Sequence, residues 1–250
     1  MQDVGLVTGL MALAFAAVHL SVPGLATLSR KPRHRFLSFA GGVAVGYVFL
    51  HILPELATHR TTFADELRLL PKIAEAAVYA LALVGLAVFY GIERAASISK
   101  NNSQERGEGE RLGGPVLALH LVAFATINLL IGYLLLHREE AGMASLAFYF
   151  VAMALHFTTA DVGMRADHAQ AYDGYGRWIL AGSVLVGWML GMMVELSEVA
   201  IGMIFAFVAG GIVLTVLKEE LPEERESRLG PFLVGAVLYG ALIFGELAMV

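Results

Sequence analysis

Residues 40–56, AGGVAVGYVFLHILPEL, decide the fold class of this sequence. From Ala40 to Leu53 the segment carries no Asp, Glu, Lys or Arg, and the uncharged run extends back to Phe36. A helix needs about 20 mainly apolar residues to cross the roughly 30 Å hydrocarbon core of a bilayer. Such runs recur along the chain, in which 58% of the residues are hydrophobic and 16% are charged. This composition excludes an ordinary soluble domain and predicts an integral membrane protein.

The uncharged runs predict an all-α, polytopic membrane protein with eight transmembrane helices. The chain, residues 1–250, is expected to form a single transmembrane domain, because no segment of soluble-domain composition separates the runs. The spans are expected near residues 4–28, 36–57, 73–92, 114–137, 142–161, 178–195, 199–217 and 229–247.

The basic residues predict how the chain is oriented. Most of the 17 Lys and Arg residues lie in the gaps after the first, third, fifth and seventh spans. Because gaps rich in Lys and Arg stay in the cytoplasm, both termini are expected outside the cell membrane, either a plasma or an inner membrane. Two of these gaps are interpreted as a mobile cytoplasmic linker at residues 94–113 and a cytoplasmic loop at residues 162–177.

A second segment, AGGIVLTVLKEELPEE at residues 209–224, resembles residues 40–56. The two share an Ala-Gly-Gly start, offset by 169 residues, and a Pro-Glu end, offset by 168. Since the predicted orientation makes these spans antiparallel, the match indicates an inverted repeat, which is typical of transporters. Residues 1–93 and 178–250 would be three-helix repeats around two central helices in residues 114–161, a 3+2+3 arrangement. Alternatively, the glycine pairs serve only close helix packing.

Two motifs in these segments resemble the ZIP (Zrt/Irt-like) family of metal transporters. They are Phe49-Leu-His-Ile-Leu-Pro-Glu55, similar to the end of the family's second span, and Glu220-Leu-Pro-Glu223, similar to the end of its seventh. The similarity in span number, orientation and 3+2+3 arrangement covers nearly the whole chain. The resemblance implies a ZIP-like bundle that carries divalent metal ions such as Zn²⁺, with the metal ligands on the fourth and fifth spans.

The chain departs from the family at the positions of these ligands. Ile127, Ile131 and Ala160 stand where the resemblance places ligands, and an apolar side chain cannot offset the dehydration of a cation. Asn128 and His156 keep ligand-type side chains and are the leading pair of candidates for a metal site. An interhelical hydrogen bond between them is the competing interpretation. With no cysteine in the chain, thiolate ligands and disulfides are excluded.

Three further residues complete the candidate metal-binding set. His51 and Glu55 share one helical face, where they would either receive a cation or form an interfacial ion pair. Asp161, beside a gap rich in Asp and His, would either bind a divalent ion or pair with Arg165 at a solvated helix end. Ionisable groups inside membrane spans are functional candidates by default. Two more of them are His19 and His120.

We therefore expect a divergent ZIP-like transporter of a divalent, zinc-type metal ion. Two other functions stay open: a non-transporting ZIP-fold protein with a regulatory or assembly role, sealed at its centre by apolar side chains, and a carrier of protons or another solute. The sequence has no phosphate-loop, dinucleotide or hydrolase motif, which argues against an enzyme. It has no basic patch for nucleic acid. The expected partners are the lipid bilayer and a divalent cation, with a homo-oligomer left open and no organic cofactor.

Overall fold

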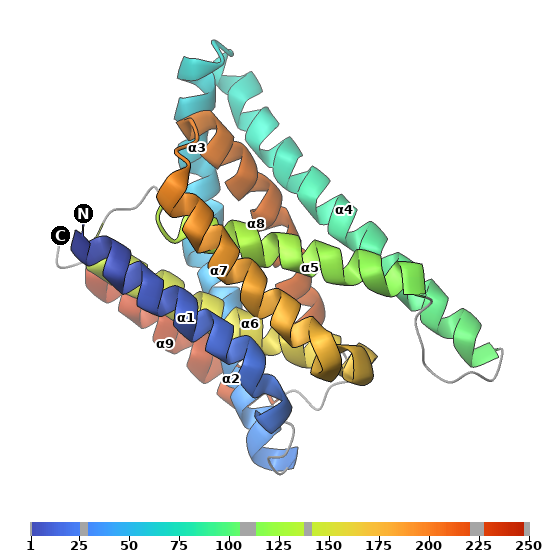
Figure 1. Cartoon of the computed structure of the whole chain (residues 1–250). Helices are drawn as coiled ribbons and strands as arrows, with labels where there is room; N and C mark the ends of the chain where they lie inside the picture. The colour runs from blue at the N-terminus through green and yellow to red at the C-terminus, as the bar shows by residue number, and fades with distance from the viewer. Residues whose placement is uncertain (1, 26–29, 106–113, 138–141, 221–227, 248–250) are drawn as a thin grey trace.

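The computed structural model describes residues 2–25, 30–105, 114–137, 142–220 and 228–247. Over these ranges the fold is entirely helical, which confirms the all-α prediction (Figure 1). The elements are α1 (Gln2–Leu25), α2 (Arg30–Tyr47), the π-helix η1 (Val48–Ile52), α3 (Leu53–Glu66), α4 (Pro71–Glu105), α5 (Gly114–Leu134), α6 (Met143–Ala171), the π-helix η2 (Tyr172–Gly176), α7 (Arg177–Met193), α8 (Glu198–Glu220) and α9 (Leu229–Leu247).

The described helices include seven that are long and apolar enough to cross a membrane. The apolar stretch of α9, Leu229–Gly245, is shorter than these, so the eighth span stays a prediction. Large apolar side chains such as Leu6, Val237 and Phe244 are exposed on the surface of the bundle. Soluble proteins rarely leave extensive apolar surface uncovered, whereas a bilayer covers it. The chain is a multi-pass membrane protein.

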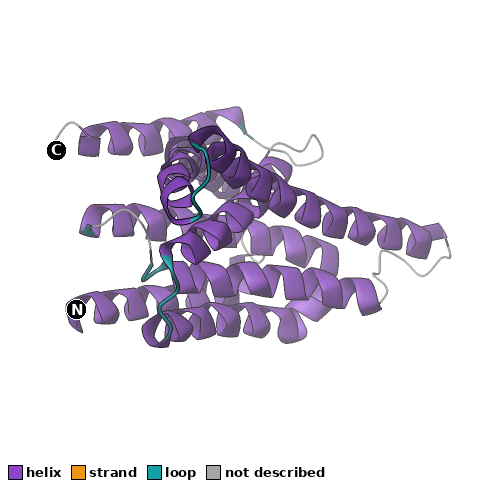
Figure 2. Cartoon of the chain, turned by 90° about the horizontal axis from the view of Figure 1, so that it is seen from above, coloured by secondary structure: helices purple, strands orange, loops and turns teal. Residues whose placement is uncertain are grey.

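The helices form one bundle in which α1 begins and α9 ends on the same side (Figures 1 and 2). The end where α5 begins and α8 finishes is called the His120 end, and the end where α7 finishes and α8 begins is called the Glu198 end. Which of them faces the cytoplasm stays a prediction from the basic residues.

The decisive segment at residues 40–56 lies in a continuous rod made of α2, η1 and α3. Pro54 has no main-chain N–H, so the regular helical hydrogen-bond pattern cannot continue through it, and the π-turn precedes it directly. The helix then continues to Glu66, beyond the predicted end of the span at residue 57. The prediction stopped where charges begin, but charged residues end a membrane span without ending a helix.

The same reasoning misplaced two predicted connections. Residues 94–105 of the predicted linker belong to α4, because helix-compatible Ser, Lys, Gln and Glu residues follow one another without a glycine or proline. The predicted loop at 162–177 is also helical: α6 runs through it to Ala171, η2 follows, and non-helical backbone angles at His168 (φ −143°, ψ 48°) mark a sharp kink. Residues 106–113 of the linker and residues 221–223 of the second motif lie outside the described residues.

Three parallel helix pairs pack through glycines that face one another. In each pair, a Cβ added to either glycine would collide with a main-chain carbonyl oxygen of the partner helix, three residues before the partner's own glycine. The backbones therefore approach more closely than any larger residue would allow, as small residues permit in membrane bundles. The pairs are Gly42 with Gly235 (α2 and α9), Gly85 with Gly210 (α4 and α8) and Gly132 with Gly187 (α5 and α7).

Candidate functional site

A buried polar cluster joins α1, α6 and η2 inside the bundle. His19 Nδ1 lies 2.6 Å from Asp161 Oδ2, and the Tyr172 hydroxyl lies 2.5 Å from the same oxygen and 2.9 Å from the main-chain oxygen of His19. All three side chains are almost completely buried, with 0% of the His19 side chain and 1% of the Asp161 side chain exposed. We call His19, Asp161 and Tyr172 the core cluster.

The contacts of the core cluster define the state of the His19 ring. The carboxylate of Asp161 accepts hydrogen bonds, so it favours the tautomer in which His19 Nδ1 carries the proton and donates it. His19 Nε2 then presents a lone pair, and this atom is buried without a hydrogen-bond partner. An imidazole held by a carboxylate through one nitrogen, with the other nitrogen available, is the usual arrangement of a metal-binding histidine.

The environment of Asp161 corrects the predicted solvated helix end. Asp161 is buried and does not pair with Arg165. Arg165 instead donates two hydrogen bonds to Asp173, both 2.7 Å long, at a partly exposed position. The i, i+4 spacing of Asp161 and Arg165 was a local signal, and the kink at His168 brings Asp173 to Arg165 in its place.

His156 and Asn128 are both buried, on α6 and α5 respectively, but no hydrogen bond joins them. The amide nitrogen of Asn128 donates to the main-chain oxygen of Phe124 in its own helix, and its Oδ1 has no partner. His156 Nδ1 is also buried without a partner, and His156 lies within electrostatic range of Asp161 and His19. The expected interhelical hydrogen bond is therefore wrong, whereas the placement of both side chains inside the bundle is confirmed.

His51 and Glu55 lie together, as their spacing predicts, toward the Glu198 end. They line a small, partly enclosed depression together with Tyr47, Ser145 and Tyr149. His51 belongs to the π-turn η1 and stacks on Tyr47, with ring centroids 5.1 Å apart. π-turns inside membrane or soluble helices are frequent at functional sites. Their role as an ion pair or a cation-receiving pair stays a prediction.

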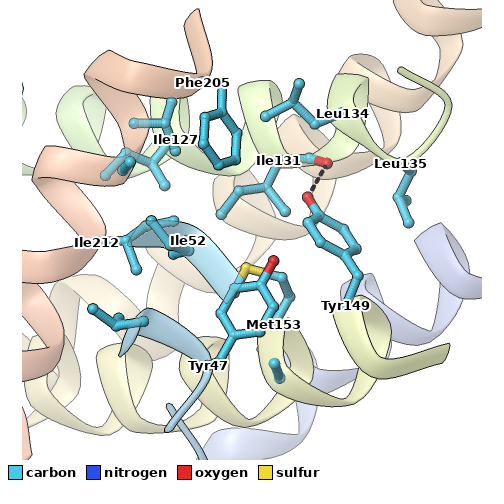
Figure 3. Close-up of a cluster of buried hydrophobic side chains, with 14 of the residues drawn as sticks. Tyr47, Ile52, Ile127, Ile131, Leu134, Leu135, Tyr149, Met153, Phe205 and Ile212 are labelled. Carbon is cyan, nitrogen blue, oxygen red and sulfur yellow. Dashed lines mark hydrogen bonds between the residues drawn. The ribbon is translucent and has the colours of Figure 1, made fainter. Parts of the chain in front are cut away.

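An apolar layer contains Ile127 and Ile131, two of the positions at which the resemblance placed metal ligands (Figure 3). Ile127 and Ile131 are buried in it, and the Tyr149 hydroxyl donates a 3.0 Å hydrogen bond to the main-chain oxygen of Ile131. Ala160 is buried in a separate apolar group around Leu180. We call the residues labelled in Figure 3 the apolar layer: Tyr47, Ile52, Ile127, Ile131, Leu134, Leu135, Tyr149, Met153, Phe205 and Ile212.

The residues that sequence reasoning missed are the partners of Asp161. His19 was notable only as a histidine inside an apolar run, and Tyr172 carried no signal, since 153 residues separate it from His19 along the chain. Across the described residues, no group of three or more His, Asp and Glu side chains has the spacing of a ready-made metal site. The candidate ligands come from different helices and do not form a closed cage.

The fold and the core cluster define a class: a polytopic helical membrane protein with a buried ionisable centre. Comparison with known proteins does not narrow this class, since no protein-family model matches the chain and no curated protein matches it.

Proposed function

We propose that this chain is a divergent ZIP-like carrier of a divalent cation such as Zn²⁺, and that the cation is bound between α1, α5 and α6. One observation carries the proposal: each of these helices contributes a buried, ligand-type atom with no hydrogen-bond partner. These atoms are His19 Nε2, Asn128 Oδ1 and His156 Nδ1.

Unsatisfied polar atoms inside a protein require an explanation, because each costs about 1–3 kcal/mol relative to a hydrogen-bonded one. Imidazole nitrogens and an amide oxygen are lone-pair donors that suit borderline divalent cations. Asp161 adds negative charge next to His19 and holds its ring in place. A cation between these helices would therefore satisfy the unpartnered atoms and have its own charge partly balanced.

The open arrangement of these atoms agrees with a carrier rather than a storage site. A carrier must release its ion, so its ligands are expected to converge in only part of the transport cycle. The apolar layer would then be the barrier that separates the depression at His51 from the core cluster. Opening this layer would let a cation that enters beside His51 and Glu55 reach His19 and His156.

The glycine contacts support the inverted repeat that such a carrier would use. Gly42 and Gly210 occupy equivalent places in the α2–α9 and α4–α8 pairs and lie 168 residues apart. The same offset separates Pro54 from Pro222, so these two helices share one register from the glycine contact to the proline, one residue out of step with their Ala-Gly-Gly starts. In an inverted 3+2+3 repeat, α2 is equivalent to α8 and α4 is equivalent to α9, so the α2–α9 pair is equivalent to the α8–α4 pair. We propose that the chain has this repeat.

The apolar layer favours a second candidate, a non-transporting protein that keeps a ZIP-like fold. In this reading Ile127 and Ile131 seal the centre permanently, and the core cluster only holds α1 against α6. A third candidate, a proton carrier, would use the same histidines and Asp161 as protonatable stations. Flux measurements separate the three.

The test is uptake into proteoliposomes that hold a Zn²⁺ indicator, with a pH indicator in a parallel set. We expect Zn²⁺ uptake by the unmodified chain and its loss in His19→Ala and His156→Ala. His137→Ala is the matched control, because His137 follows the end of α5, away from the core cluster, and stacks on Tyr133. Zn²⁺ uptake no faster than in empty vesicles would overturn the proposal. Proton flux without Zn²⁺ uptake would support the proton carrier. The absence of both fluxes would support the sealed, non-transporting protein.

A further inference from the structure

A second polar group lies at the His120 end, where α4, α5, α6 and α8 meet. The buried ring of His120 is held on both sides: its Nε2 lies 3.1 Å from Glu93 Oε1, and its Nδ1 lies 3.3 Å from His168 Nε2. The other oxygen of Glu93 accepts a hydrogen bond from the Lys218 ammonium. Neither the sequence motifs nor the proposed transport path uses Glu93, His120 or His168.

We propose that His120 and His168 form a second divalent-cation site, with Glu93 as the residue that positions and polarises His120. Two nitrogens bound to one tetrahedral Zn²⁺ at about 2.0–2.1 Å lie about 3.3–3.4 Å apart. The observed separation of 3.3 Å equals this distance. To bind one ion, both rings would turn toward it, and the nitrogen that carries the proton of the present hydrogen bond would release that proton. Water would complete the coordination, so binding would be weak and reversible.

The contact between His120 and Glu93 would orient the ring of His120 in such a site. Glu93 accepts the proton of His120 Nε2, which leaves the lone pair of His120 on Nδ1, the atom that faces His168. Lys218 in turn holds the Glu93 carboxylate. The carboxylate thus fixes the tautomer that a cation needs, as Asp161 does for His19 in the core cluster.

The backbone and the surroundings of His168 fit a ligand role. His168 stands at the kink of α6, where non-helical backbone angles aim its ring at His120, with the two rings nearly perpendicular at 86°. Both histidines line a small pocket that is partly open to the surface. Tyr172 lines this pocket and also contacts Asp161, so the pocket borders the core cluster.

The experiment is equilibrium binding of Zn²⁺ alone to the full chain in detergent, with a chromophoric chelator as competitor. Five proteins are compared: the unmodified chain, His120→Ala, His168→Ala, His156→Ala and the double variant of His168 and His156. We expect His168→Ala to remove one bound ion whether or not His156→Ala removes another. The two proposals therefore succeed or fail separately.

Glu93→Gln tests the positioning role while keeping the size of the side chain. Loss of a carboxylate that supports a metal-bound histidine lowers metal affinity by about 10–100-fold, and we expect this loss with the ion still bound at high Zn²⁺. His137→Ala is again the control and should bind as the unmodified chain does. Unchanged Zn²⁺ binding in both His168→Ala and His120→Ala would overturn the inference and leave an imidazole–imidazole hydrogen bond as the role of this pair.

Discussion

Replacing Asp161 by alanine is the perturbation that tests the core cluster most directly. The Asp161 side chain is 1% exposed and receives two short contacts, from a fully buried His19 and from the Tyr172 hydroxyl. Hydrogen bonds to a charged group are worth about 1.5–3 kcal/mol each, and removing one partner of a buried pair costs about 3–5 kcal/mol. We therefore expect Asp161→Ala to lower the free energy of unfolding by about 3–5 kcal/mol.

Asp173→Ala is the matched control for this prediction. Asp173 also accepts two short hydrogen bonds, from Arg165, but the side chains are 36% and 27% exposed. Exposed ion pairs contribute only about 0.2–1 kcal/mol, because water and salt screen them. The two aspartates thus have similar contact distances and differ mainly in burial.

The measurement is thermal unfolding in detergent, followed by near-ultraviolet circular dichroism. For a chain of this size, 1 kcal/mol corresponds to about 2–4 °C in Tm, so Asp161→Ala should lower the Tm by about 6–20 °C and Asp173→Ala by no more than about 4 °C. Equal losses in the two variants would refute the reasoning, since burial would then have no influence on the strength of these contacts.

Two further predictions follow from close contacts. Gly187→Ala should lower the free energy of unfolding by about 1–3 kcal/mol in the same assay, because the added Cβ would collide with the Leu129 carbonyl oxygen. Gly182→Ala on the same helix is the control: its Cβ would meet open space, so the change should be neutral or stabilising by up to about 1 kcal/mol. Tyr172→Phe should lower the free energy of unfolding by about 1.5–3 kcal/mol, because the Asp161 carboxylate loses a hydrogen-bond donor that nothing replaces. A Tm equal to that of the unmodified chain would show that this hydrogen bond does not stabilise the carboxylate.

Much of the fold could be predicted from the sequence, but helix ends could not. The length of an uncharged run depends only on neighbouring residues, and the predicted spans at 114–137, 142–161 and 199–217 each overlap one described helix, α5, α6 and α8 respectively. Charge placement, however, reports where a helix leaves the bilayer and not where it stops. The helix at residues 94–105 and the helical corner after Asp161 were misread for this reason.

The segment at residues 40–56 shows which properties of this protein follow from the sequence and which depend on the tertiary structure. Its apolar length, its proline and its glycines are local properties, and they were sufficient to predict a membrane helix and the pairing of His51 with Glu55 on one face. The partners of Asp161 are not local: His19 lies 142 residues away, and only the packing of α1 against α6 brings the two together. A side chain's neighbours along a helix follow from its period, whereas its neighbours across a bundle depend on which helices pack and at what depth, so only the tertiary structure could distinguish a buried centre from a solvated loop.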